Sequence, residues 1–186
     1  AWRSALAAQL VTPEDSTWTM LGKRLFSSGN SGKYNLSPAV SPDGRYIVFL
    51  SERDIYSLDL FLADAGSGEI LSKIYTSSRN ADIDALEYTE TAGSLSPDNR
   101  YFAFVAYQKG KSVIMIYDVK KGQTERTIFQ PGVDAVSSPV WSPNGEGIAF
   151  SAMRMGISNL CYFSFVDNSF KFLTRSSYAA MQPAWS

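Results

Sequence analysis

The chain has 186 residues and a formal net charge of −1, from 17 basic and 18 acidic side chains. Hydrophobic residues make up 45% of it and charged residues 19%, a composition that can bury a core and excludes a disordered chain. The charge balance gives no basic surface of the kind that binds nucleic acid or an anionic membrane.

Two residue counts exclude further kinds of site. The chain has no histidine, which removes the serine–histidine and cysteine–histidine nucleophile systems and every histidine-ligated metal site. Its single cysteine, Cys161, allows neither an intrachain disulfide nor a cysteine-rich zinc site, and we expect it to be a packed, inert thiol. No apolar run approaches the roughly 18 residues of a membrane-spanning helix. We therefore expect no enzyme active site, cofactor or metal in this segment.

The N-terminal part of the chain differs from the rest. Residues 1–20 are predicted to form a short amphipathic helix and a linker, because Trp2, Leu6 and Leu10 would share one helical face. Residues 22–26 have the pattern of an outer strand that precedes a first repeat.

From residue 21 to residue 186 a short motif, here called the anchor, recurs. It reads Ser-Pro-Asp-Gly-Arg at 41–45, Ser-Pro-Asp-Asn-Arg at 96–100 and Ser-Pro-Asn-Gly-Glu at 142–146, and a fourth copy begins with Pro-Ala-Trp-Ser at 183–186. Proline sets a turn corner, and the following dipeptides tolerate the positive φ that tight hairpins need. The serines of successive anchors are 55, 46 and 44 residues apart. A period of roughly 40–45 residues built from short strands is typical of propeller blades.

Each anchor is followed by three predicted strands. The first, at 46–50, 101–105 and 148–150, is apolar at both parities, so both of its faces should be buried. Two more strands follow in each copy, at 57–63 and 70–76, at 112–117 and 124–129, and at 159–165 and 170–174. With the strand that leads into the anchor, each repeat has the four strands of a blade.

The sequence therefore predicts an all-β fold: a β-propeller segment of four-stranded antiparallel blades over residues 21–186. Three full repeats do not close a ring, since propellers typically have about four to eight blades. An incomplete ring would expose apolar faces and unpaired strand edges. We expect either a fragment of a longer protein or a subunit whose open edge other proteins cover.

The anchor, the aromatic–aliphatic strand after it and the Pro-Ala-Trp-Ser lead-in resemble those of the TolB-type, WD-repeat-like β-propellers of bacteria. Related blades occur in the tricorn and prolyl-oligopeptidase propellers. The resemblance implies a periplasmic or envelope location and a role in protein binding or assembly. It does not fix the function, because this fold is a scaffold that hosts many roles.

The long loop at 78–94 carries Asp82, Asp84, Glu87 and Glu90. Clustered carboxylates can bind Ca²⁺, but the EF-hand pattern is absent. The loop is interpreted as an ion site, a partner-contacting loop or a solvated surface loop.

Loops that lead into the anchors and loops that join the two middle strands should share one rim of the propeller, the default binding surface of such a scaffold. The residues predicted there are Arg53, Asp54, Asp82, Asp84, Glu87, Asp134, Arg154 and Tyr178. The alternative for the charged members is weak, solvent-exposed ion pairing. Trp141 and Trp185 occupy the same repeat position and are predicted to pack between blades.

The function predicted from these features is a non-catalytic binding or assembly module of the bacterial envelope, as an accessory subunit or part of a larger complex. The alternative is the substrate-docking or gating propeller of a multidomain peptidase whose catalytic residues lie outside this chain. A third hypothesis, an enzyme propeller that uses rim carboxylates, would require an ion such as Ca²⁺.

Overall fold

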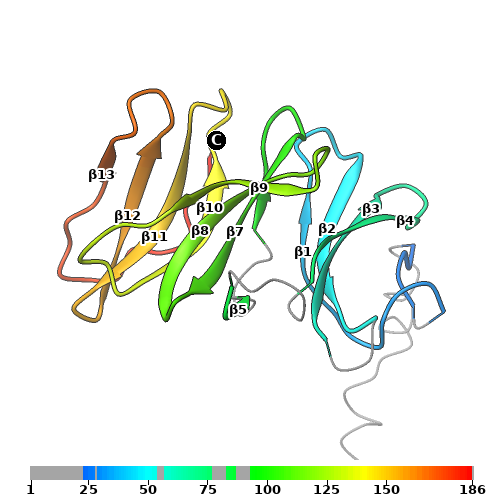
Figure 1. The fold of residues 1–186 in the computed structure, drawn as a ribbon. Helices are drawn as coiled ribbons and strands as arrows, with labels where there is room; N and C mark the ends of the chain where they lie inside the picture. Colours follow the sequence, from blue (N-terminus) through cyan, green and yellow to red (C-terminus); the bar gives the residue numbers. More distant parts are fainter. Residues whose placement is uncertain (1–22, 28, 54–56, 77–82, 87–92, 186) are drawn as a thin grey trace, which may run out of the picture.

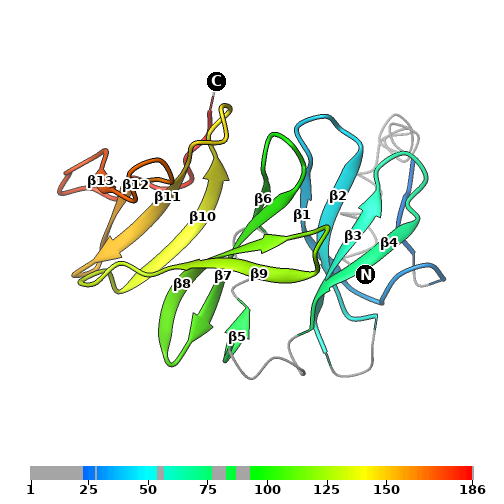
Figure 2. The ribbon, with the colours of Figure 1, turned by 45° about the horizontal axis from the view of Figure 1, so that its top comes forward.

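The strand behind each anchor is apolar on both faces and so needs a packing partner on each side. The computed structural model meets this need by placing antiparallel sheets side by side in chain order, as Figures 1 and 2 show. It describes residues 23–27, 29–53, 57–76, 83–86 and 93–185. The three described sheets are called blades 1, 2 and 3.

The blades are built from consecutive strands, each paired antiparallel with the next. Blade 1 contains β1 (Asn35–Val40), β2 (Tyr46–Ser51), β3 (Asp59–Asp64) and β4 (Ile70–Tyr75). Blade 2 contains β5 (Ala85–Leu86) and β6 (Ser94–Leu95), which both pair with β7 (Tyr101–Gln108), then β8 (Lys111–Asp118) and β9 (Gln123–Ile128). Blade 3 contains β10 (Ala135–Trp141), β11 (Gly147–Arg154), β12 (Ile157–Ser164) and β13 (Phe170–Phe172).

The prediction of an all-β chain of antiparallel sheets is confirmed for the described residues, and blades 1 and 3 have the four strands expected. Blade 2 has five, because the short strands β5 and β6 both pair with the same side of β7. The expected N-terminal helix falls within residues 1–22, which lie outside them. The expected strand at 22–26 is wrong for its described part, because residues 23–27 have no strand. Leu25 and Phe26 instead pack against Ile47 and Phe49 on the outer face of blade 1. The backbone at Leu25 passes close to the turn between β3 and β4. Its carbonyl oxygen lies 2.6 Å from the position that a Cβ on Gly68 would occupy.

Two buried clusters join the blades, and the alternation of side chains along each strand explains why there are two. Phe102 and Phe104 of β7 point toward blade 1, where they meet Val48 and Leu50 of β2. Ala103 and Val105 of the same strand point toward blade 3, into a cluster with residues of β11 and β12. The strand β7 is thus covered on both faces, as its sequence predicted.

The three anchors have the same hydrogen bonds. In the second, the Ser96 Oγ donates to the Asp98 carboxylate and accepts from the Tyr101 amide at 2.9 Å, while the Arg100 amide donates to Asp98 Oδ1 at 3.1 Å. The corresponding bonds recur around Ser41 and Ser142. The fourth residue of each anchor has positive φ: 72° at Gly44, 57° at Asn99 and 73° at Gly145. This confirms the turn chemistry predicted from the three dipeptides.

The segment before Ser186 lies against blade 3 as β10 lies against blade 2. The Ala180 amide donates to the Ser158 carbonyl at 2.9 Å, and the Gln182 amide donates to the Ser151 Oγ at 2.9 Å. Gln182 has a φ of 56°, and the residues four positions before the first and third anchors, Ser37 and Ser138, have φ of 49° and 51°. Residues 180–185 therefore adopt the backbone of a fourth lead-in.

Candidate functional site

The end of each blade opposite its anchor is called the hairpin rim, because the hairpins between the two middle strands lie there. In blade 3 this hairpin is Met155–Gly156, with φ of 53° and 78°, and in blade 2 it is Lys109–Gly110, with φ of 52° and 70°. Positive φ at both central residues is the requirement of a type I′ turn. The two hairpins are thus equivalent positions of successive repeats.

The lead-in loops reach the same rim, as the sequence predicted. The Asp134 carboxylate accepts a hydrogen bond from the Met155 amide at 2.7 Å, and Asp84 accepts one from the Gly110 amide at 2.7 Å. Each aspartate therefore fastens a lead-in loop to the hairpin of its own blade. The structure gives these two carboxylates a structural role, in addition to the partner contact proposed for them.

The other predicted rim residues are spread over the blades. Arg53, in blade 1, lies 6.0 Å from the centroid of the Phe61 ring. Arg154 is exposed at the end of β11, and Tyr178 is 81% exposed after β13. Asp54, Asp82 and Glu87 lie outside the described residues. Of the described candidates, Asp134, Arg154 and Tyr178 all lie on blade 3 or its flanking loops, which makes blade 3 the best-defined part of the rim.

Blade 3 carries a groove of about 700 Å³ at its hairpin rim. Its lining residues are Arg154, Met155, Ile157, Asn159, Phe172, Thr174, Arg175 and Ser176. The floor is fixed by Asn159, whose Oδ1 accepts hydrogen bonds from the Thr174 hydroxyl and the Ser176 amide, both at 3.0 Å. The Asn159 side chain, together with backbone bonds such as that from the Leu173 amide to the Leu160 carbonyl at 2.8 Å, therefore holds the loop after β13 beside β12.

The groove is lined by two arginines and no acidic side chain. Neither Arg154 nor Arg175 forms an ion pair with a described residue, and both are exposed. Met155 is 86% exposed and Ile157 is 37% exposed, so apolar side chains stand beside the two positive charges. This arrangement can bind, and the lining has no carboxylate or imidazole that could act as a general base for the Thr174 and Ser176 hydroxyls.

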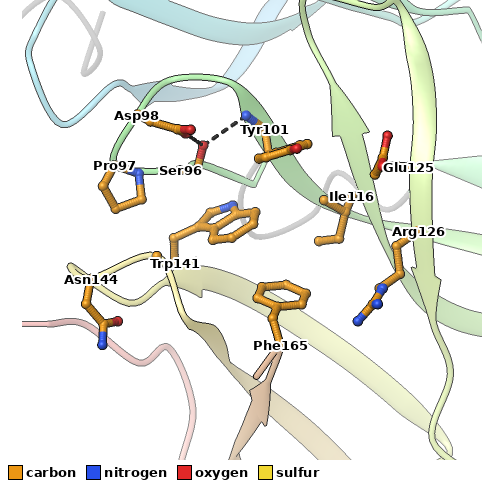
Figure 3. Close-up of a pocket in the computed structure, with 11 residues that line it drawn as sticks. Ser96, Pro97, Asp98, Tyr101, Ile116, Glu125, Arg126, Trp141, Asn144 and Phe165 are labelled. Carbon is orange, nitrogen blue, oxygen red and sulfur yellow. Dashed lines mark hydrogen bonds between the residues drawn. The ribbon is translucent and has the colours of Figure 1, made fainter. Parts of the chain in front are cut away.

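A second groove, of about 450 Å³, lies between blades 2 and 3 at the anchor rim. Figure 3 shows Tyr101, Trp141 and Phe165 around it, with Ile116 and Arg126 on the opposite wall. The ring centroids of Trp141 lie 6.1 Å from Tyr101 and 5.1 Å from Phe165, so Trp141 packs between blades as predicted. A smaller groove of about 350 Å³ occupies the equivalent place between blades 1 and 2. The anchor-rim grooves are thus a repeated product of blade packing.

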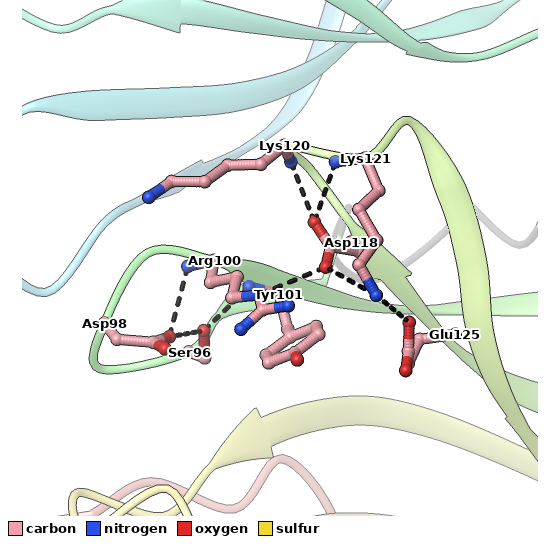
Figure 4. A network of polar contacts seen from close by, with 8 residues as sticks. All are labelled: Ser96, Asp98, Arg100, Tyr101, Asp118, Lys120, Lys121 and Glu125. Carbon is pink, nitrogen blue, oxygen red and sulfur yellow. Dashed lines mark hydrogen bonds and ion pairs between the residues drawn. The ribbon is translucent and has the colours of Figure 1, made fainter.

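A polar network beside this groove holds the outer turn of blade 2. The buried Asp118 carboxylate accepts from the amides of Lys120 and Lys121 at 3.0 and 2.9 Å and pairs with the Arg100 guanidinium at 3.1 Å (Figure 4). The Lys121 amide, with the Arg100 side chain, holds the pKa of Asp118 below its usual value of 3.8. The same Asp118 bond raises the pKa of Arg100. The Asp118 carboxylate and the Arg100 guanidinium therefore have a structural role, which is to hold the outer turn of blade 2.

Metal and thiol chemistry find no support in the part of the chain described. No group of three potential metal-ligating side chains occurs among those residues. Cys161 is fully buried, and desolvation raises the pKa of its thiol to about 12, so the prediction of a packed thiol is confirmed. No helix in the described ranges is long and apolar enough to cross a membrane.

Sequence reasoning missed Arg175, Met155 and Ile157. A signal for the last two was present, because aligning the second and third repeats places them where blade 2 has Lys109 and Lys111. A change from lysine to an apolar residue on an exposed hairpin is unusual for a solvated surface. Arg175 had no such signal, because its place beside Arg154 depends on how the loop after β13 folds back.

Three comparisons place this chain among known proteins. No family model matches it. It is 29% identical over 115 residues to the Tol-Pal system protein TolB of Hydrogenovibrio crunogenus, covering 60% of this chain and 22% of that protein. The crystal structure of TolB from Acinetobacter baumannii superposes with a TM-score of 0.65 at 25% identity, covering 84% of this chain and 35% of that structure. The chain thus has a TolB-type β-propeller fold and spans about a fifth of the length of its curated relative.

A more distant likeness concerns the fold alone. An acylaminoacyl peptidase in complex with a chloromethyl ketone has a TM-score of 0.52 at 14% identity, and the match covers 76% of this chain and 25% of that structure. The TM-score shows that the two folds are alike. An identity this low carries no information on activity.

Proposed function

We propose that this chain is a non-catalytic protein-binding scaffold of the bacterial envelope that contacts its partner through the hairpin rim of blade 3. The observation that carries the proposal is the exposure of Met155, at 86%, in a groove whose two arginines have no ion pair among the described residues. Tyr178, three residues after Arg175, is 81% exposed. Large apolar side chains clustered on a rigid, otherwise well-packed surface mark interaction sites.

The TolB likeness supports the class of function. TolB is described as a protein of the Tol-Pal system, and a periplasmic or envelope location with a binding role for this chain agrees with that likeness. We propose further that the chain acts as a subunit of a larger assembly, in which another protein covers the open edge of the blades. The support for this is physical, since exposed strand edges and apolar faces favour association.

Site-specific photo-crosslinking in native envelopes tests the proposal. A photoreactive residue at Met155 or Tyr178 should yield a discrete crosslinked product, identified by mass spectrometry. The same residue at Glu146, exposed on the anchor rim, is the matched control and should yield none. Equal yields at both rims, or no product at either, would contradict a binding role for the hairpin rim.

The alternative, a docking or gating propeller of a multidomain peptidase, draws only on the likeness of blade shape to peptidase propellers. It predicts that the same polypeptide carries a His-Glu-x-x-His helix upstream or a Gly-x-Ser-x-Gly segment downstream. Sequencing the gene on both sides of the region that encodes this chain separates the two proposals.

A further inference from the structure

The hairpin that lines the groove of blade 3 differs in sequence from the equivalent hairpin of blade 2. Arg154 pairs with Ile157 across the turn as Gln108 pairs with Lys111, so the two hairpins occupy the same places in the ladder. Blade 2 has Gln-Lys-Gly-Lys where blade 3 has Arg-Met-Gly-Ile. The fold accepts lysines here, and therefore the apolar residues of blade 3 are not required by the turn.

The groove lies on the face of blade 3 that is turned toward blade 2. Cys161 and Phe172 pair across β12 and β13 and belong to the cluster that packs against blade 2. Asn159 and Ile157 lie on the same face of β12, because alternate residues of a strand share a face. The groove thus continues, beyond the packed core, the side of blade 3 that is turned toward blade 2.

The two charged side chains that line the groove, Arg154 and Arg175, are both positive. The Asp134 carboxylate is outside the lining, although it lies close by and accepts a hydrogen bond from the Met155 amide. The apolar lining lies between these charges, from Met155 and Ile157 on the hairpin to Phe172 on β13. Complementarity calls for a ligand with carboxylates that flank an apolar side chain.

Resting on the proposed function, we infer that this groove binds an acidic segment of a partner protein, in which a leucine-like side chain enters between Met155, Ile157 and Phe172. Carboxylates on either side of that side chain pair with Arg154 and Arg175. Arginine suits such contacts because its planar guanidinium binds a carboxylate through two hydrogen bonds. The apolar side chain gives the contact its affinity, and the arginines set its register and its preference for acidic partners.

The test measures binding of three short synthetic peptides to the full chain by calorimetry and by methyl NMR. The first carries leucines flanked by glutamates, the second has lysines in place of the glutamates, and the third has glycines in place of the leucines. We expect the first to bind and to shift the methyl signals of Met155 and Ile157. The other two should bind at least about tenfold more weakly, and added salt should weaken the first.

Arg154→Gln, Met155→Lys and Ile157→Lys introduce the residues of the blade 2 hairpin, so we expect these variants to keep the fold while they change the groove. Arg154→Gln with Arg175→Gln should weaken the glutamate–leucine peptide about five- to tenfold, the range of two exposed ion pairs. Met155→Lys with Ile157→Lys should weaken it too, although these changes add positive charge. Lys109→Gln with Lys111→Gln is the matched control on the neighbouring hairpin and should leave binding unchanged.

Three results would overturn the inference. The first is no binding of the glutamate–leucine peptide, and the second is equal or tighter binding of that peptide to the Met155→Lys, Ile157→Lys protein. The third is the same loss of affinity in the Lys109→Gln, Lys111→Gln control as in the arginine variant. The last two would show that the contact depends on charge alone. Crosslinking from Tyr178 separates this inference from the proposed function. If a partner still crosslinks to the arginine variant with full yield, the rim binds proteins but the groove does not select acidic segments.

Discussion

The Asn99 Nδ2 of the second anchor donates a hydrogen bond to the Asp43 Oδ2 of the first at 2.7 Å. This bond joins two neighbouring blades at their anchor rim. The third anchor has Gly145 in the place of Asn99, so no side chain reaches back to Asp98. The groove between blades 2 and 3 is correspondingly larger than the one between blades 1 and 2.

This relationship predicts the effect of substitutions at Gly145. Gly145→Asn should be tolerated, because Asn99 holds the same positive φ and the nearest atom to an added Cβ is the Pro97 Cδ at 3.9 Å. Gly145→Val should lower the free energy of unfolding by about 1–2 kcal/mol, since a β-branched residue resists this backbone region. Urea unfolding of both variants checks the difference, and equal stabilities would contradict the role of φ.

Substitution of the anchor serine Ser96 should destabilise the chain more than substitution of Gly145. Ser96→Ala removes the hydroxyl that bonds both Asp98 and the Tyr101 amide and should destabilise the chain by about 1–3 kcal/mol, because a partly buried amide loses its partner. Ser177→Ala, an exposed serine after β13, is the control and should stay within about 0.5 kcal/mol of wild type. Thermal and urea unfolding measure both, and similar losses would rule out the anchor network as the cause.

The aspartate at the hairpin rim predicts a local rather than a global effect. Asp134→Ala frees the Met155 amide and should speed its hydrogen exchange, while amides of the β7–β8 core keep their protection. Asp134→Asn retains an oxygen acceptor and should exchange more slowly than the alanine variant. Exchange rates of Met155 that do not respond to either substitution would contradict the capping role.

Burial of Cys161 predicts its reactivity. It is the only cysteine, and its pKa is raised to about 12, so a thiol reagent at pH 8 should modify the chain only after denaturant unfolds it. The folded pKa exceeds the unfolded one. The thiol's contribution to stability is therefore present below the unfolded pKa and is lost as pH rises toward 12. Fast labelling of the native chain would show that blade 3 opens.

The Asp118 network predicts sensitivity to acid. The folded pKa of Asp118 is lowered, so its contribution to stability is present above the unfolded value of 3.8 and is lost as pH falls through the lower, folded value. Asp118→Asn should destabilise the chain at neutral pH, where Arg100 loses its partner, and should flatten the fall in stability below about pH 4. An unchanged acid profile would place the titration in other carboxylates, among which Asp43, Asp64 and Asp167 also have lowered pKa values.

Much of the fold could be predicted because it depends on local chemistry. Dipeptides such as Asp43–Gly44 tolerate the backbone of a hairpin, and two-sided apolar strands such as Tyr101–Val105 require neighbours on both faces. The strand predicted at 22–26 was wrong because its pattern resembles an outer strand, while its backbone pairs with no described strand. Pattern alone does not reveal which edge is available for pairing.

The sequence by itself determined the repeat, the turn positions and the kind of core, since these follow from residue spacing and backbone preference. Only the tertiary structure decided where the charges lie. A net charge of −1 conceals that Asp118 neutralises Arg100 inside blade 2, while Arg154 and Arg175 stand unpaired among the described residues at the hairpin rim of blade 3. Electrostatic interaction depends on distance and solvent exposure, and both are set by how distant segments fold against one another.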